Sequence, residues 1–209
     1  MTDGFSFSDV ARSYYSTTQL ERLNAVTVGI AGAGGIGSNC ALMLVRSGFR
    51  KLVLADFDRI TPSNLNRQAY RAEDIGRMKV NTLAENCRGI NPEINITIFP
   101  VRVAADTVRS IFDDCDVIVE AFDDPAAKAL LFSAYITSEK LLVGASGIAG
   151  IGDSELIRVR EVRNNCFIVG DEITAVSESN KPFAPRVMIA AAKMADIVLS
   201  WAVNTTGQG

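Results

Sequence analysis

The sequence predicts an α/β fold: a Rossmann-like, mostly parallel sheet with helices on both faces, followed by a small antiparallel extension and a C-terminal helix. Three observations predict it. Apolar runs with strand character alternate with helical patterns through residue 145, as in sheets built from βαβ units. These runs are almost continuously apolar, which is typical of parallel strands covered on both faces. A glycine-rich turn follows the first run, at the end of a strand where such folds bind ligands.

The first half of the chain supplies three strands and their helices. Residues 9–23 have the pattern of one or two short helices, and Thr17 and Thr18 are able to cap the second. Gly48 ends the helix after the glycine turn, and Asn91-Pro92 ends the next one. We expect strands at residues 26–31, 51–55 and 94–101, and helices at residues 38–47 and 78–90.

The second half begins in the same way and then changes. Pro125 fits the first turn of a helix, and the segment DVIVEA before it fits a fourth strand. We expect helices at 106–112 and 125–140, strands at 116–121 and 141–145, two further strands at 157–162 and 166–169, a polar mobile loop at 171–182, and a long helix at 183–201.

These elements predict a single domain across residues 1–209. It divides into an N-terminal helical segment (1–24), a nucleotide-binding α/β core (25–150), and an extension with its mobile loop and closing helix (151–209). Residues 1–8 lack the charged start and apolar run of a secretory signal. Lys193 and Asp196 interrupt the apolar closing helix, which predicts a core helix and not a membrane span. We therefore expect a cytoplasmic protein without a membrane partner.

Composition excludes several classes of chemistry. The chain has 209 residues, a net charge of -3 and no histidine, which excludes Ser-His-Asp and Cys-His catalysis and histidine metal sites. Its lysines and arginines are scattered, so we expect no nucleic-acid partner. The four cysteines, Cys40, Cys87, Cys115 and Cys166, form no C-x-x-C pair. We therefore expect buried thiols and no zinc.

The glycine turn has the pattern of a phosphate-binding turn. Gly32-x-Gly34-x-x-Gly37 joins a predicted strand to a predicted helix, so the backbone can approach a phosphate at the helix N-terminus. Asp56 ends the next strand, 19 residues after Gly37, where a carboxylate suits a ribose hydroxyl. This pattern does not separate an NAD site from an ATP site, and a purely structural glycine turn is a third interpretation.

A loop dense in amide and guanidinium groups follows Asp56. Residues 63–68 read SNLNRQ, and such planar side chains suit phosphate and ribose oxygens. A triphosphate that is cleaved needs cations and a metal, and Arg67 and Lys79 are candidate cations. Asp123, after the fourth strand, is a candidate Mg²⁺ ligand. The structural alternative makes Arg67 a loop brace, Lys79 a solvated residue and Asp123 a helix N-cap.

Four motifs together resemble one family. GAGGIG, LADFDRITPSNLNRQ, GRMK at residues 76–79 and EAFDD are similar to the ThiF/MoeB family of ubiquitin-activating-type adenylyltransferases, over roughly residues 20–150 and part of the final helix. The resemblance implies ATP- and Mg²⁺-dependent adenylation of the C-terminal Gly-Gly carboxylate of a ubiquitin-like sulfur carrier, ThiS-like and for thiamine biosynthesis. A molybdopterin-type carrier has the same tail and stays open. The family also implies a homodimer.

Matching this chain to the family motifs gives the expected site. The resemblance implies catalytic roles for Arg67, Lys79 and Asp123, with Asp123 positioning the metal. It implies that the nucleotide contacts Gly32, Gly34, Gly35, Gly37, Asp56, Asp58, Ser63, Asn64, Arg67, Gln68, Lys79 and Asp124. The missing histidine fits this chemistry, because a peptide carboxylate has a pKa of about 3.5 and is already ionised at neutral pH. The enzyme then has only to align it and to neutralise the departing pyrophosphate.

The chain departs from the family in two places. It lacks the two C-x-x-C zinc pairs of full-length members, so it is closest to the short ThiF-type proteins. It also lacks the N-terminal R-Y-x-R-Q, whose arginine reaches across the dimer. Arg12 stands in that region and is either a substitute or a helix surface residue. Cys166 is the cysteine nearest the polar loop, and we expect a structural thiol there, because Arg163 alone gives weak support for a reactive one.

Three other functions stay open on the sequence. An NAD-binding oxidoreductase accounts for the glycine turn and Asp56 but leaves Arg67 and Lys79 without a role. A non-catalytic scaffold that binds carrier or nucleotide is compatible with the missing R-Y-x-R-Q. An enzyme that adenylates a modified tRNA base belongs to the same superfamily, but the acidic net charge disfavours it.

Overall fold

A computed structural model describes residues 6–204, so the predictions for residues 1–5 and 205–209 lie outside the described part. Its centre is a seven-stranded sheet with the order β3-β2-β1-β4-β5-β7-β6, in which only β6 runs antiparallel to its neighbour. The strands are β1 (Thr27–Ala31), β2 (Lys51–Ala55), β3 (Asn95–Phe99), β4 (Val117–Glu120), β5 (Leu141–Ala145), β6 (Arg158–Arg163) and β7 (Cys166–Gly170). The predicted fold class is confirmed.

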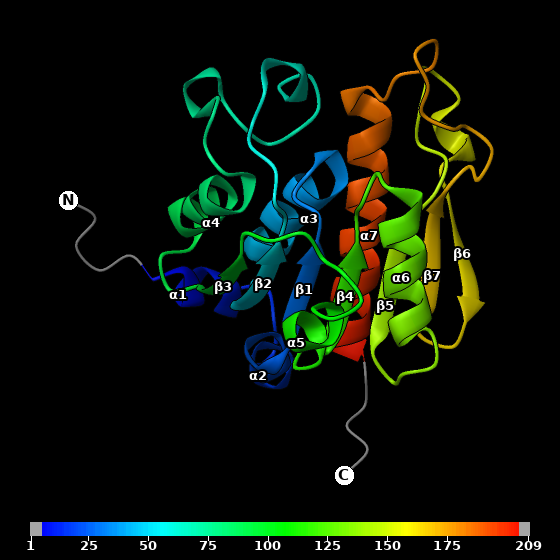
Figure 1. Cartoon of the computed structure of the whole chain (residues 1–209). Helices are drawn as coiled ribbons and strands as arrows, with labels where there is room; N and C mark the ends of the chain where they lie inside the picture. Colours follow the sequence, from blue (N-terminus) through cyan, green and yellow to red (C-terminus); the bar gives the residue numbers. More distant parts are fainter. Residues whose placement is uncertain (1–5, 205–209) are drawn as a thin grey trace.

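Helices cover both faces of this sheet (Figure 1). They are α1 (Phe7–Arg12), α2 (Thr17–Ala25), α3 (Gly35–Arg46), α4 (Lys79–Ile90), α5 (Val108–Phe112), α6 (Pro125–Tyr135) and α7 (Ala184–Asn204). Three short 3-10 helices, η1 (Pro62–Asn64), η2 (Ala72–Asp74) and η3 (Ser154–Leu156), lie in the loops. The extension, β6 with β7, joins the main sheet because β7 pairs in parallel with β5.

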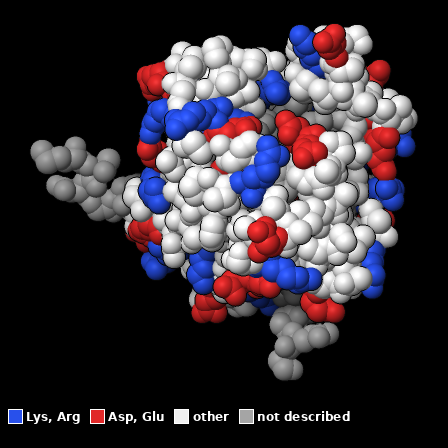
Figure 2. Space-filling view, viewed as in Figure 1, with Lys and Arg blue, Asp and Glu red and all other residues white. Residues whose placement is uncertain are grey.

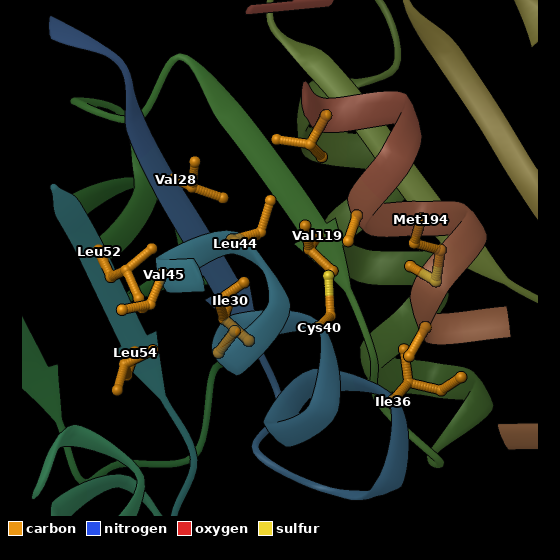
Figure 3. Close-up of a cluster of buried hydrophobic side chains, with 14 of the residues drawn as sticks. Val28, Ile30, Ile36, Cys40, Leu44, Val45, Leu52, Leu54, Val119 and Met194 are labelled. Atoms are coloured by element: carbon orange, nitrogen blue, oxygen red, sulfur yellow. The ribbon is translucent and has the colours of Figure 1, made fainter. Parts of the chain in front are cut away.

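Two hydrophobic clusters hold the layers together, one on each face. The larger contains the buried sides of α3, α4 and α7; in Figure 3, Cys40 of α3 lies beside Val119 of β4, with Met194 of α7 nearby. The smaller contains Phe112 of α5 and Leu131 and Tyr135 of α6. Burial of these apolar side chains is the main driving force for the fold.

The parallel strands end at one edge of the sheet. Ala31 pairs with Ala55 and with Glu120, and Glu120 pairs with Gly144, so the ends of β1, β2, β4 and β5 lie in one row. We call these strand ends and the loops that follow them the rim. The rim is the upper edge of the sheet in Figure 1, where the loop 56–78 and the loop 171–182 stand on opposite sides.

Three local expectations from the sequence are wrong. The helix expected at 125–140 ends at Tyr135, and turns and bends follow it, because isoleucine, threonine and serine are weaker helix formers than the alanines and leucines before them. The helix after the glycine turn begins at Gly35 and not at residue 38, so Gly35 and Gly37 lie inside its first turn. The N-cap of α2 is Ser16, which forms a capping box with Gln19; Thr17 and Thr18 are helical residues. Ser16 is the better cap because its side chain and that of Gln19 satisfy one another's backbone N–H groups.

Helix α7 closes the fold. It is long and apolar enough to cross a membrane by length and composition, but in this fold its buried side packs on α3 and β5. Near its start, Arg186 forms an ion pair with Asp171, with 2.5 Å between Nη2 and Oδ2. Both side chains are almost completely buried, at 4% and 3% exposure. This pair fastens the first turn of α7 to the loop after β7.

The pH dependence of stability tests this ion pair. Burial alone raises the pKa of Asp171, but N–H groups of Thr174 and Ile173, the Thr174 hydroxyl and Arg186 together hold that pKa below its ordinary value. The pair therefore stabilises the fold above a pH of about 4, and its contribution disappears as the pH falls through the lowered pKa. We expect Asp171→Asn to lose about 3–5 kcal/mol at neutral pH, because Arg186 stays buried without its partner.

Urea unfolding of both proteins from pH 7 down to pH 2 measures the difference. We expect the gap between wild type and Asp171→Asn to close at the acid end. Glu172→Gln is the matched control, because Glu172 pairs with Arg160 on the surface; its effect should be much smaller. A gap that is unchanged with pH would contradict the role given to the Asp171 carboxylate.

Candidate functional site

The glycine turn joins β1 to α3 with no room for a side chain at Gly32 or Gly37. A Cβ on Gly37 would lie 1.8 Å from the carbonyl oxygen of Gly32, and one on Gly32 would lie 2.8 Å from the carbonyl oxygen of Ala121. Gly32 also has a φ of 98°, a conformation that glycine adopts without steric cost. The end of β1, the first turn of α3 and the loop after β4 therefore touch directly. This contact places the N-terminus of α3 on the rim.

Asp56 holds the glycine turn. Its Oδ2 accepts from the N–H of Ala33 and its Oδ1 from the N–H of Asp58, both at 2.7 Å. Asp56 is 8% exposed; burial raises its pKa, while Lys79 and these two N–H groups oppose the rise. Each carboxylate oxygen keeps a second lone pair, so the same group can brace the turn and accept from a ribose hydroxyl.

Lys79 is a buried cation on the rim. Its Nζ lies 2.7 Å from Oδ2 of Asp58, with side-chain exposures of 8% for the lysine and 44% for the aspartate. The backbone N–H of Lys79 also donates to the carbonyl of Asp58. Lys79 is thus paired and not the solvated residue of the structural alternative. A buried, hydrogen-bonded charge of this kind is costly to leave without a partner.

The predicted Arg67 lies against the glycine turn. A Cβ on Gly35 would be 3.4 Å from Cγ of Arg67. Its guanidinium donates to the carbonyl of Ser63 at 3.1 Å and to Oδ1 of Asn66 at 2.7 Å. Arg67 therefore braces the loop in this state, and its methylene groups lie beside Gly35, the first residue of α3.

The polar side chains at the start of this loop bond to one another. Asn64 Oδ1 accepts from the N–H of Thr61 at 3.0 Å, and the hydroxyl groups of Ser63 and Thr61 are 3.0 Å apart. Ser63 is exposed and Asn64 is half-buried. These contacts shape the short helix η1 ahead of Arg67.

Gln68 carries a buried oxygen without a partner. It is 8% exposed, and its Oε1 has no hydrogen-bond partner within residues 6–204. Its Nε2 is 3.9 Å from the position of a Cβ on Gly34, so this amide lies against the glycine turn. Buried polar atoms are nearly always satisfied, so an unpaired one at this position indicates a ligand or ordered water.

The loop after β4 brings two aspartates to the rim. Oδ1 of Asp124 accepts from the N–H of Ala126 at 3.0 Å, so Asp124 is the N-cap of α6, the role that the structural alternative gave to Asp123. Asp123 is exposed. No cluster of three or more acidic or cysteine ligands occurs in the described part of the chain. Mg²⁺ commonly binds one or two carboxylates together with substrate phosphates, and the exposed Asp123 fits that mode.

Several polar contacts of the site escaped the sequence analysis. Ser38 Oγ accepts from the N–H of Ala69 at 3.0 Å, and Asn39 Nδ2 donates to the carbonyls of Gly35 and Arg67 at 2.7 and 2.9 Å. These hydrogen bonds attach the backbone of Arg67 and Ala69 to α3. The available signal was the pair Ser38-Asn39 inside an otherwise apolar helix.

A second missed feature is a buried ion pair at the end of β4. Glu120 is completely buried and pairs with Lys128 of α6, while its Oε1 accepts from the N–H of Phe122 at 2.8 Å. Burial raises the pKa of Glu120, and Lys128 opposes that rise. Lys128 also donates to the carbonyl of Ala145. This pair fixes the loop that carries Asp123. The sequence feature that could have indicated it is a single charged residue in each of two otherwise apolar segments.

Arg12 and the four cysteines do not contribute exposed side chains to the rim. Arg12 pairs with Asp9 on the surface of α1, with 3.0 Å between Nη1 and Oδ1. All four cysteines are buried and unpaired. Burial raises the pKa of Cys40 to about 12 and that of Cys87 to about 12. Burial also raises the pKa of Cys166, although Arg160 and Arg163 oppose it.

Comparisons with a family profile and with known sequences agree on the family of this chain. A profile described as the ThiF family matches residues 8–203. The adenylyltransferase and sulfurtransferase UBA4 of Candida glabrata is 30% identical over 142 residues, which are 68% of this chain and 33% of that protein. The uba4 protein of Aspergillus fumigatus is 34% identical over 61% of this chain and 26% of its own length. The chain thus spans about a third or less of these relatives.

Solved structures share the fold. The E. coli tRNA N6-threonylcarbamoyladenosine dehydratase TcdA, in complex with ATP, superposes with a TM-score of 0.81 at 22% identity and covers 96% of both chains. E. coli MccB with ATP has a TM-score of 0.72 at 22% identity, over 94% of this chain and 62% of that one. At these identities the likeness concerns the fold.

Gly37→Ala tests the close contact on which the glycine turn depends. The new Cβ would collide with the Gly32 carbonyl, so the strand end and the helix must separate. We expect a loss of about 3 kcal/mol in urea unfolding, typical of severe overpacking, and no measurable ATP binding by calorimetry. The matched control is Gly89→Ala in α4, where a Cβ meets nothing within 4 Å. Alanine favours helix, so that variant should be at least as stable as wild type, and equal stability of the two variants would contradict the argument.

Proposed function

The chain belongs to the ThiF family, and we propose that it is an ATP-dependent adenylyltransferase, which joins a substrate carboxylate to AMP and releases pyrophosphate. One observation carries the proposal: the N-terminus of α3 shares the rim with two cations and with an unpaired buried amide. Arg67 lies against Gly35, and Gln68 lies against Gly34. The N–H groups and the cations suit a polyphosphate, and the Gln68 oxygen, which can only accept, suits a hydroxyl group of the nucleoside. The ATP complexes of the structural neighbours support the same ligand.

The substrate that we propose is the C-terminal Gly-Gly carboxylate of a ubiquitin-like sulfur carrier. The relatives are named for adenylyl transfer together with sulfur transfer, which supports a carrier of this class. Within it, we propose a ThiS-like carrier of thiamine biosynthesis, on the resemblance to short ThiF-type proteins; a molybdopterin-type carrier would present the same tail. The family resemblance also supports a homodimer.

The rim residues suit this reaction. The carboxylate needs no base, because it is ionised at neutral pH. The N–H groups of α3 and the Arg67 guanidinium would bind the phosphates, and Asp56 would accept from the ribose. Lys79 would stabilise negative charge near Asp58. Asp123 would hold Mg²⁺ together with phosphate oxygens, and that ion supplies charge neutralisation for pyrophosphate as it leaves.

A second candidate function follows from the length of the structural match. TcdA matches over 96% of both chains, whereas the UBA4 proteins match over only 33% and 26% of their own length. TcdA is named for N6-threonylcarbamoyladenosine of tRNA, and the threonine part of that group also carries a carboxylate. The surface does not favour tRNA: basic and acidic side chains are interspersed across the face in Figure 2, and the net charge is -3. Nucleic-acid sites are usually continuous basic areas.

ATP–pyrophosphate exchange tests the proposed function. Wild type should exchange label only when a Gly-Gly-tailed carrier is present. We expect Arg67→Ala and Asp123→Ala each to slow exchange by about 10²–10³-fold, the usual cost of removing one charge-stabilising group. Arg71→Ala is the matched control in the same loop, because its guanidinium is exposed and pairs with Glu73 on the surface.

Three outcomes would contradict the proposal in different ways. Exchange with tRNA and not with a carrier would select the TcdA-like function. Tighter binding of NAD than of ATP would select an oxidoreductase. Binding of ATP and carrier without exchange would select a scaffold. Separately, normal exchange by Asp123→Ala would contradict the metal-binding role given to that residue.

The buried cysteines lead to a prediction about the next step. The acyl-adenylate must be consumed by a nucleophile that attacks the acyl carbon and releases AMP. Because the thiols are buried and Cys166 has a raised pKa, we expect that nucleophile to come from another molecule. Cys166→Ser should leave the exchange rate within about twofold of wild type, and mass spectrometry should find no thioester between carrier and chain. Native protein should also resist alkylation at pH 7.5, whereas urea-unfolded protein should accept four alkyl groups; a carrier thioester on Cys166 would contradict this.

A further inference from the structure

Tyr70 makes a contact that neither the sequence motifs nor the proposed mechanism uses. The side chain is 7% exposed, and its hydroxyl donates to the carbonyl of Ala33 at 2.7 Å. The carbonyl of Lys79 lies further away, at 3.3 Å. A phenol has one hydrogen to donate, so the shorter contact to Ala33 is the main one. Burial raises the pKa of Tyr70, and the Asp56 charge raises it further, so the hydroxyl keeps its proton at neutral pH.

This hydrogen bond fixes the direction of a neighbouring N–H. The carbonyl of Ala33 and the N–H of Gly34 belong to one planar trans peptide and point in opposite directions. Holding the carbonyl with Tyr70 therefore turns the Gly34 N–H away from the tyrosine. The preceding peptide is held by Asp56 through the Ala33 N–H. Both restraints act where glycines on either side leave the backbone otherwise free to rotate.

The Gly34 N–H is available to a ligand. Gly34 is the N-cap of α3 and offers no capping side chain, and its N–H has no acceptor among residues 6–204. The buried, unpaired amide oxygen of Gln68 belongs to the side chain that lies against the same residue. Two unsatisfied polar groups at a helix N-terminus indicate a polar ligand there. The N–H groups favour its anionic part, whereas the Gln68 oxygen would accept from a hydroxyl group of the same ligand.

We propose that Tyr70 is a positioning residue for the phosphates of the nucleotide, acting by aiming the Gly34 N–H at them. The inference rests on the proposed function, because it assumes that the ligand of the rim is a nucleoside phosphate. Tyr70 itself does not touch the ligand. Its single oxygen holds the Ala33 carbonyl, while Asp56 holds the Ala33 N–H.

Tyr70→Phe removes only that oxygen, and calorimetric titration with ATP and with adenosine measures the effect. We expect ATP to bind about 3- to 10-fold more weakly, the range that corresponds to one ordinary hydrogen bond. Adenosine lacks phosphates, so its affinity should change by less than about twofold. A purely structural role would weaken both ligands together.

Tyr135→Phe is the matched control. Tyr135 is 1% exposed, and its hydroxyl also has two partners, Oδ1 of Asp113 at 2.8 Å and the carbonyl of Val108 at 3.1 Å. It lies in the smaller cluster, on the other face of the sheet. Its loss should lower the unfolding temperature in a similar way while ATP affinity stays at the wild-type value.

The outcomes separate this inference from the proposed function. Wild type that does not bind ATP overturns the proposed function and the inference with it. Wild type that binds ATP as tightly as Tyr70→Phe does, or equal losses for ATP and adenosine in that variant, overturns the inference alone. If Tyr70→Phe does not fold, NMR of the wild type decides: the Gly34 amide proton should shift downfield on titration with ATP, and an unmoved resonance overturns the inference.

Discussion

The contact between Gly37 and the carbonyl of Gly32 is the constraint on which the rest of the rim depends. With no Cβ at position 37, the first turn of α3 can rest directly on the end of β1. That approach places the unpaired N–H groups of α3 at the row of strand ends. It also lets Val187 of α7 reach Gly35, where a Cβ would lie only 2.9 Å away. The glycines therefore decide both where an anion can bind and how closely the closing helix packs.

Carboxylates at the strand ends convert that geometry into a rigid rim. Asp56 accepts from the N–H groups of Ala33 and Asp58, and Glu120 accepts from the N–H of Phe122 while it pairs with Lys128. Loop N–H groups at a buried strand end need acceptors, and a carboxylate can satisfy two of them. The cost of burying the charge is offset where a lysine lies nearby, as Lys79 and Lys128 do. These carboxylates thus fix the loops. Apolar side chains at the same positions would leave the loop N–H groups without acceptors.

The fold was largely predictable from local pattern, and the site was predictable only in its motifs. Continuous apolar runs predicted the bounds of β2 and β5, because these runs show no helical periodicity and end where polar or loop-forming residues begin. The start of α3 was placed three residues late, because glycine is a poor helix former and its role there is set by packing against Gly32. Tyr70, Asn39 and Glu120 were missed for a different reason. Their hydrogen-bond and ion-pair partners are brought close by the tertiary fold, and no sequence spacing predicts those contacts.

The rim also restricts the kind of group that it can activate. Histidine is absent from the chain, burial raises the thiol pKa values, and the amine of Lys79 is held by Asp58. A nucleophile that needs a base near neutral pH finds none among these groups. A carboxylate needs none, and it is the group that a Gly-Gly tail and a threonylcarbamoyl nucleoside have in common. Under the proposed function, the chemistry of the rim would therefore select the reacting group, and the surface around it would select the molecule that carries that group.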